Sequence, residues 1–181
     1  MKKYFILKAL LVVSCFSSLF AQSVPDPEFS GSPYILAEDN SLKNLEKTEA
    51  QVDVKVKIIG GNDTYFTISS PKSNLRFSKG ALPKLIMKVD GNVDPSDITS
   101  LYVAEIKKNQ RKFLQGSMGG VYKKARDVSK LSVKLEFKKI RDGIYEIILP
   151  SDIQSGEYGF IPSSVSTSTN SKIKIMCFGI D

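Results

Sequence analysis

The chain has 181 residues, no histidine and no tryptophan, and its 26 basic and 19 acidic residues give a formal net charge of +7. Without histidine it lacks the commonest general base, the Ser–His and Cys–His nucleophile pairs and the usual zinc ligand. Catalysis would depend on a carboxylate pair, a Ser–Lys dyad or a metal bound by oxygen ligands. We expect a single domain, because this length buries an ordinary core without added cross-links.

The N-terminus has the organisation of a secretory signal peptide. A basic start, residues 1–3, precedes an apolar run that closes at Ala21, and a polar, proline-containing segment follows. The apolar stretch after Lys8 is shorter than the roughly 20 residues of a membrane-spanning helix, so we predict cleavage after Ala21 and no integral membrane segment. The alternative is a bacterial lipobox at residues 12–15, which would leave an acylated Cys15 as a lipid anchor.

Cleavage would change both the charge and the thiol content of the chain. Lys2, Lys3 and Lys8 leave without any acidic residue, which lowers the net charge from +7 to +4. A weakly basic exported chain is not typical of nucleic-acid binding. Cys15 leaves as well, so Cys177 would have no intramolecular disulfide partner, and we expect its thiol to be buried within a strand.

The mature chain divides into a short tether and one folded domain. Residues 22–33 contain three prolines and little apolar content, which predicts a flexible tether before a domain over residues 34–181. Residues 32–37 are predicted to form a first edge strand, where proline is tolerated. Residues 40–47 fit a helix or a strand equally well.

Strand patterns dominate the rest of the chain. Val52, Val54, Val56 and Ile58 alternate with polar residues, which places one face in a core and the other in water. The apolar segment 101–104 predicts a strand covered on both faces. Further strands are predicted at residues 65–68, 75–77, 85–89, 131–137, 144–149, 156–160 and 172–178, with a capped helical turn at Asp94–Pro95 and a hairpin turn at Asp142–Gly143.

Short, regularly spaced strands with turn signals between them predict an all-β, antiparallel β-sandwich, immunoglobulin-like or related, of about 8 to 11 strands. The segment 147–160 resembles the corner of immunoglobulin-like folds, in which a tyrosine hydrogen-bonds to the backbone a few residues upstream. Tyr158 would be that tyrosine. The chain has no tryptophan and no second cysteine near it, so the resemblance implies the architecture and not the antibody-type core.

Several short sequence words also resemble a group of uncharacterised exported bacterial β-rich proteins. They are the segments 34–36 and 42–47, the pair Asp94–Pro95, the motif around Tyr158 and the terminal residues 178–181. The likeness spans most of the mature chain, and it implies export and a β-rich domain without an established activity.

Three basic clusters are the candidate binding residues. If their connections met at one end of the sandwich, they would attract an anionic polysaccharide, lipid headgroup or acidic protein; solvated hairpin tips are the simpler interpretation. The residues assigned to this surface are Lys107, Lys108, Arg111, Lys112, Lys123, Lys124 and Arg126, and a third cluster contains Lys138, Lys139 and Arg141.

Other patterns give weaker indications of chemistry. Residues 90–94 begin like a calcium loop, but Pro95 and Leu101 stand where that loop needs glycine and glutamate, so a turn is expected. The glycine-containing segment 116–124 lacks a phosphate-loop spacing. Ser117 with Lys123 or Lys124, and Glu105 with Glu136, are enzyme options resting on residue type alone. We therefore predict no catalytic, cofactor or metal site, and structural roles for Tyr158 and Cys177.

The sequence thus favours an exported, non-enzymatic binding or interaction module of the cell envelope or extracellular space, acting on an undetermined protein or envelope component through loops or an edge strand. Two alternatives stay open. One is a carbohydrate- or peptidoglycan-active enzyme that uses a carboxylate pair. The other is a structural subunit of a surface assembly, for which an exposed apolar edge strand would be the sign.

Overall fold

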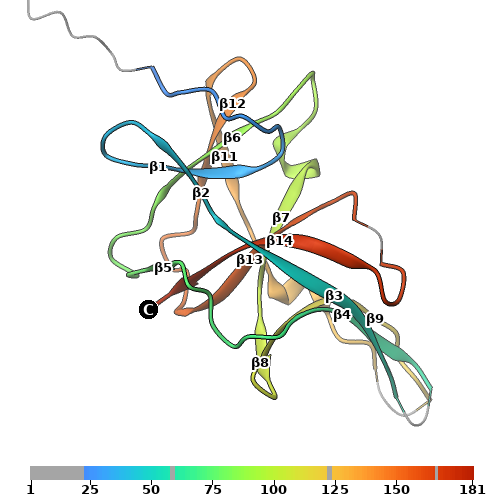
Figure 1. Ribbon diagram of the computed structural model, residues 1–181. Helices are drawn as coiled ribbons and strands as arrows, with labels where there is room; N and C mark the ends of the chain where they lie inside the picture. Colours follow the sequence, from blue (N-terminus) through green and yellow to red (C-terminus); the bar gives the residue numbers. More distant parts are fainter. Residues whose placement is uncertain (1–22, 58–59, 122–123, 166) are drawn as a thin grey trace, which may run out of the picture.

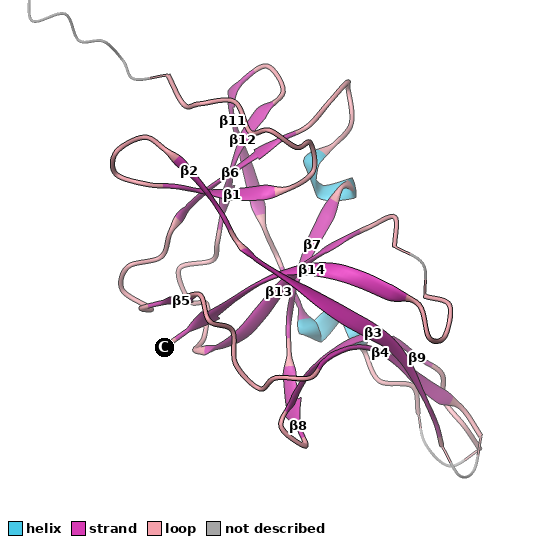
Figure 2. Ribbon diagram, viewed as in Figure 1, coloured by secondary structure: helices cyan, strands magenta, loops and turns pink. Residues whose placement is uncertain are grey.

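The computed structural model describes residues 23–57, 60–121, 124–165 and 167–181. The predicted signal peptide and the lipobox alternative lie outside this part of the chain. The described residues are almost entirely strands and loops, with two short 3-10 turns, η1 (Pro95–Asp97) and η2 (Val128–Leu131) (Figure 2). No helix among them is long and apolar enough to cross a membrane.

The described residues form two sheets (Figure 1). The smaller has five strands, in the order β11 (Glu136–Arg141), β12 (Ile144–Ile148), β6 (Lys84–Lys88), β1 (Pro33–Leu36) and β2 (Leu42–Asn44). The larger has nine: β10 (Ser132–Val133), β7 (Thr99–Val103), β13 (Gly156–Pro162), β14 (Lys172–Ile180), β3 (Glu46–Val56), β4 (Asn62–Ile68), β9 (Gln110–Ser117) and β8 (Glu105–Lys107), with β5 (Arg76–Phe77) parallel to the end of β14. The antiparallel sandwich is confirmed, with more strands than the sequence predicts.

The larger sheet closes on itself because one continuous stretch of chain pairs with β13 near one end of the strand order and with β9 near the other. β7 pairs with β13, and after Ala104 the same stretch continues as β8 and pairs with β9. The Ala104 N–H still donates to the Glu157 carbonyl at 2.7 Å, so the change of partner occurs directly after this residue. We call β7–β8, β13, β14, β3, β4 and β9 the closed sheet.

Side chains of alternate residues on β13 and β14 enter two different cores. Tyr158, Phe160 and Phe178 face the five-stranded sheet and belong to the core that also contains Leu85 and Ile147. Their neighbours on the same strands, including Ile161, Ile175 and Cys177, fill the interior of the closed sheet with Phe66 and Phe113. The strict alternation of strand side chains thus serves both cores at once.

Both residues predicted to be structural lie as expected. Cys177 is fully buried and unpaired among the described residues, and burial raises the pKa of its thiol to about 12. The Tyr158 hydroxyl donates to the Gln154 carbonyl at 2.6 Å, which is the predicted backbone bond four residues upstream. The segment 101–104 is also covered on both faces, since Leu101 lies in one core and Tyr102 and Ala104 pack against the other.

Two strand predictions need correction. Residues 131–137 do not form one strand: the chain leaves the larger sheet after β10 and joins the smaller one at β11, although Val133, Leu135 and Phe137 all pack on the same core. β1 is not at an edge but lies between β6 and β2, and Pro33 is tolerated because it is the first residue of the strand. Residues 40–47, left open before, form β2 and the start of β3.

The described part of the predicted tether packs against the five-stranded sheet. The Gly31 N–H donates to the Lys88 carbonyl at 2.8 Å, and the Arg141 guanidinium forms an ion pair with Asp26. The predicted turn at Asp94–Pro95 is confirmed as η1, where the Asp94 carboxylate accepts the Ser96 N–H at 2.9 Å.

Candidate functional site

The predicted basic surface is largely neutralised by neighbouring carboxylates. Lys107 forms a 2.6 Å ion pair with Glu105, which also binds Arg126. Lys112 is 4.0 Å from the Asp53 carboxylate and lies over the Tyr65 ring. Lys108 and Lys124 are exposed, and Lys123 lies outside the described residues. The binding role of this group stays a prediction, but few of its members present a free charge.

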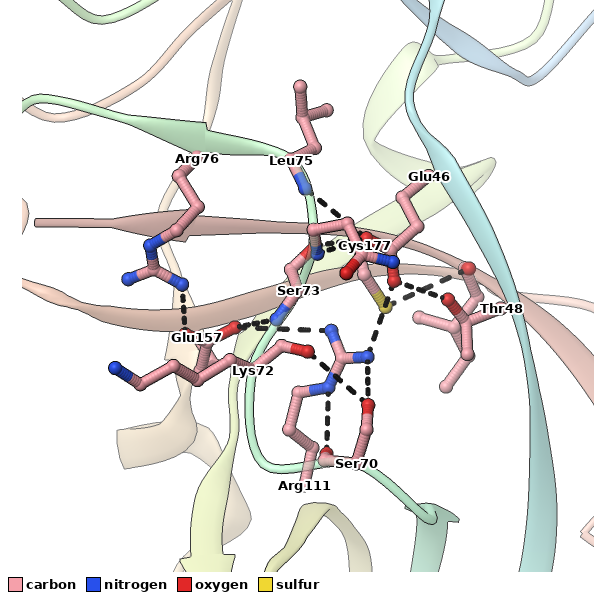
Figure 3. A network of polar contacts seen from close by, with 12 residues as sticks. Glu46, Thr48, Ser70, Lys72, Ser73, Leu75, Arg76, Arg111, Glu157 and Cys177 are labelled. Atoms are coloured by element: carbon pink, nitrogen blue, oxygen red, sulfur yellow. Dashed lines mark hydrogen bonds and ion pairs between the residues drawn. The ribbon is translucent and has the colours of Figure 1, made fainter.

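Arg111 does not belong to that surface. Its side chain is completely buried, because it follows the hairpin turn on the face of β9 that looks into the closed sheet, as Phe113 does. Figure 3 shows it surrounded by Glu46, Glu157 and Ser70. The prediction of an exposed side chain at this position was wrong.

Arg111 joins the closed sheet to the loop that follows β4. Its Nε donates to the Ser70 carbonyl at 3.2 Å, and its Nη2 donates to Ser70 Oγ at 3.0 Å and to Glu46 Oε1 at 3.4 Å. Its Nη1 lies 3.9 Å from Glu157 Oε2 and has no hydrogen-bond partner. A buried charge with such partners is a structural tie, and its loss would leave the Glu46 carboxylate without its cation.

Glu46 and Glu157 hold the same loop from the other side. Glu46 accepts hydrogen bonds from Ser73 Oγ at 2.8 Å and from the Asn74 N–H at 2.5 Å. Partial burial raises its pKa, but these bonds together with those from Thr48 and the Leu75 N–H outweigh it and lower the pKa to about 2. Glu157 accepts the Ser73 N–H at 2.7 Å.

The same contacts extend to the C-terminal strand. Arg76 donates to Glu157 at 2.6 Å and to the Asp181 carboxylate at 2.9 Å, which anchors β5 beside the end of β14. Both oxygens of Glu157 are thus taken by protein donors, and its side chain is only 6% exposed. These carboxylates are therefore occupied in fastening the loop, which leaves them poorly placed for acid–base work on a substrate.

The arrangement that is free to meet a partner is a projecting arm. Figure 1 shows β3, β4 and β9 running together away from the body of the molecule, at the lower right. The three most exposed large apolar side chains of the described residues lie where the strands of the arm end. Val56, the last residue of β3, is 75% exposed, and Met118 and Val121, which follow β9, are 63% and 80% exposed. We call these three residues the apolar tip. Isolated exposed apolar residues are common, but such a concentration is not.

A buried polar group braces the arm just behind the apolar tip. The Lys57 ammonium forms a 2.8 Å ion pair with Asp63 and donates to the Met118 carbonyl at 3.0 Å. Ser117 Oγ donates to the same Asp63 carboxylate at 2.6 Å and accepts the Arg126 N–H at 2.8 Å. Burial raises the pKa of Asp63, but the bonds from Lys57 and Ser117 outweigh it and hold the pKa below its ordinary value.

Glycines bring the two loops of the arm into backbone contact. Gly61 has a φ of +82°, and a Cβ there would lie 2.4 Å from the Met118 carbonyl oxygen and 2.7 Å from Gly119. Gly60, also at +82°, faces Gly120. The Met118 N–H donates to the Asn62 carbonyl at 2.7 Å. The apolar tip is therefore held on a preorganised base.

The enzyme options considered from the sequence do not assemble among the described residues. Ser117 meets Lys57 at 3.3 Å, not Lys124, and the Lys57 ammonium is held by the Asp63 carboxylate and the Met118 carbonyl. Glu105 lies in the larger sheet and Glu136 in the smaller one.

The calcium-like segment forms the capped turn that the sequence predicts. The Ser96 hydroxyl donates a hydrogen bond to the Asp94 carboxylate at 2.7 Å. No group of three or more potential metal ligands occurs in the described part of the chain. This surface forms a shallow hollow whose polar lining includes Asn92, Lys139 and Asp142. Lys139 and Asp142 pair with each other at 2.7 Å.

The sequence did not reveal the apolar tip or the carboxylates that surround Arg111. The strict alternation in β3 gave no sign that Val56 leaves the core where the strand projects from the body, and Glu46 and Glu157 are ordinary strand residues in the sequence. The glycine pairs at 60–61 and 119–120 were the one available signal, because paired glycines in two connections permit close backbone contact.

Fold and site together define an all-β protein in which a closed sheet packs against a five-stranded sheet and extends a braced arm. Comparison with protein-family models, with curated proteins and with solved structures found no match.

Proposed function

We propose that this protein is an exported, non-enzymatic binding module of the cell envelope or extracellular space, and that it makes contact through the apolar tip. The observation that carries the proposal is the concentration of Val56, Met118 and Val121 at the end of one arm. Exposing these side chains to water is unfavourable, so a surface that covers them would gain the free energy of their burial.

The bracing of the arm supports this assignment. Lys57, Asp63 and Ser117 fix the three strands relative to one another before any partner arrives. A preorganised contact surface loses little conformational entropy on binding, which raises affinity. A loop that only connects two strands does not need these bracing contacts.

The export part of the proposal rests on the signal-peptide pattern of residues 1–21, and it is tested separately. Mass spectrometry of the N-terminal peptide of the protein isolated from its own cells should find Gln22 at the N-terminus. An acylated Cys15 would establish the lipid-anchored alternative, and an intact Met1 in a cytoplasmic fraction would contradict export.

Site-specific photo-crosslinking tests the contact surface. A photoreactive amino acid replaces Met118 in the tip or, as a matched control, Ile148, which is 39% exposed on the smaller sheet. After irradiation with cell-envelope material, adducts of protein or lipid are expected at position 118 and not at position 148. Equal labelling at both positions, or no adduct at either, would contradict the proposed contact surface.

A further inference from the structure

We propose that the apolar tip binds an anionic lipid surface, inserting its aliphatic side chains between headgroups while the lysines of the arm contact lipid phosphates. This inference rests on the proposed function and names its partner. It follows from the shape and composition of the tip, from its backbone hydrogen bonds and from the charges around it.

The composition of the apolar tip suits hydrocarbon better than a protein pocket. Val56, Met118 and Val121 are aliphatic or thioether side chains at the end of a projection. Protein interfaces gain most of their binding energy from tryptophan, tyrosine and arginine seated in complementary pockets. Acyl chains need no such complement, because they adapt to the side chains that enter them.

Three backbone N–H groups at or beside the tip donate hydrogen bonds within the protein. The Met118 N–H donates to the Asn62 carbonyl at 2.7 Å, the Lys57 N–H to Gly61 at 3.0 Å and the Gly60 N–H to Lys57 at 3.2 Å. Polar backbone groups that reach the hydrocarbon of a bilayer must be satisfied internally, because water is scarce there. These groups would therefore not be stranded when the tip is inserted.

The charges of the arm complement an anionic surface. Lys55 on β3 and Lys124, three residues after Val121 in the sequence, are exposed, and the structure records no ion pair for either among the described residues. Asp63 on β4, which supports the base of the tip, is 6% exposed and pairs with Lys57. Basic side chains beside inserted apolar ones are the combination that gives peripheral proteins selectivity for anionic lipids.

Vesicle cosedimentation of the purified full chain tests the inference. The probes are vesicles of phosphatidylcholine with or without phosphatidylglycerol, and wild-type protein should bind the anionic vesicles at least about tenfold more tightly. V56S/M118S/V121S should lower that affinity by about tenfold or more. K55Q/K124Q should remove most of the preference for phosphatidylglycerol and its sensitivity to salt.

The matched control is V93S/I148S, which removes two exposed apolar side chains elsewhere and should leave vesicle affinity unchanged. Residues 1–22 are identical in every variant, so binding through that segment would persist in V56S/M118S/V121S and would overturn the inference. Unchanged circular dichroism and an unreactive Cys177 show that each variant is folded.

Two results separate this inference from the proposed function. If wild-type protein ignores both kinds of vesicle while position 118 crosslinks to a protein, the lipid inference fails and the proposed contact surface stands. If there is neither vesicle binding nor crosslinking at position 118, both fail. Binding that does not distinguish the two vesicle compositions would also overturn the assignment of an anionic surface.

Discussion

At the scale of single residues, Arg111 is the charge that holds the loop after β4 against the end of the closed sheet. Replacing it with alanine removes the cation that pairs with Glu46 and opens a void, so Arg111→Ala should lower the free energy of unfolding by about 3–5 kcal/mol. Chemical denaturation followed by circular dichroism measures this loss.

Two further variants make the Arg111 result interpretable. Arg111→Lys keeps the charge but not the planar fork that reaches Ser70 and Glu46, so an intermediate loss is expected. Lys108→Ala removes an exposed cation from the same hairpin and should cost less than about 0.5 kcal/mol. Equal effects of Arg111→Ala and Lys108→Ala would show that the buried contacts carry no stability.

Glu46 should make the protein sensitive to acid. Its pKa in the folded protein is about 2, below the ordinary value of 4.5, so the fold favours the carboxylate. Its contribution is fully present above pH 4.5 and is lost as the pH falls toward about 2. Glu46→Gln should be less stable at neutral pH by about 1–3 kcal/mol and should lose less stability across this acid range.

Urea unfolding at a series of pH values measures the Glu46 contribution, with Glu49→Gln as the control on the same strand. Glu49 is 58% exposed and pairs with Lys172 at the surface, so its loss should leave the acid dependence close to that of the wild type. A Glu46→Gln protein with the wild-type acid dependence would contradict the role of this carboxylate.

The contrast between Arg111 and Cys177 shows what residue-level reasoning from the sequence can reach. Cys177 follows Ile173 and Ile175 at strand spacing, so its burial was predictable. Arg111 lies two residues before Phe113, and Lys112 lies two residues before Leu114. Both Phe113 and Leu114 are fully buried. With apolar residues on both faces, the pattern could not decide which cation enters the core.

At the scale of elements, Gly159 is what allows β13 to line the closed sheet. A Cβ at this position would lie 2.7 Å from Ile175 and 2.8 Å from the Phe113 ring, both of which are fully buried. Gly159→Ala should therefore destabilise the protein by about 1–3 kcal/mol through overpacking. Gly116→Ala on β9 is the matched control, because its nearest neighbour would be 3.9 Å away.

Thermal unfolding of the two glycine variants compares them directly. The Gly159→Ala midpoint should fall clearly below that of the wild type, whereas Gly116→Ala should stay close to it. If both variants unfold with the wild-type midpoint, the interior of the closed sheet is looser than its contacts indicate.

Alternation in the sequence identified which residues face a core, but not which sheet they belong to. Val133, Leu135 and Phe137 all pack on the core between the sheets, so their spacing stays regular while the chain passes from β10 to β11. The closure of the larger sheet was hidden for a similar reason. Nothing in the residues around Ala104 signals a change of pairing partner, because strands pair through backbone groups, which do not depend on the side chains.

At the scale of the whole molecule, β13 and β14 make the two cores depend on each other. Phe178 belongs to the core between the sheets, and the residue before it on β14, Cys177, belongs to the interior of the closed sheet. Neither core can be opened without disturbing these two strands. We therefore expect one cooperative unfolding transition, as small single domains usually show.

Cys177 reports on that cooperativity. Leu85→Ala on β6 creates a cavity in the other core and should cost about 2–5 kcal/mol. If the cores open together, the labelling of Cys177 by a thiol reagent should become at least about thirtyfold faster, since labelling follows the population of the open state. Peptide mapping separates this thiol from Cys15, and Ile148→Ala on the same small sheet is the control, which should leave the labelling rate nearly unchanged. A Leu85→Ala protein that unfolds at lower denaturant but labels Cys177 at the wild-type rate would mean that the closed sheet is stable on its own, and the shared strands would then couple the two cores only weakly.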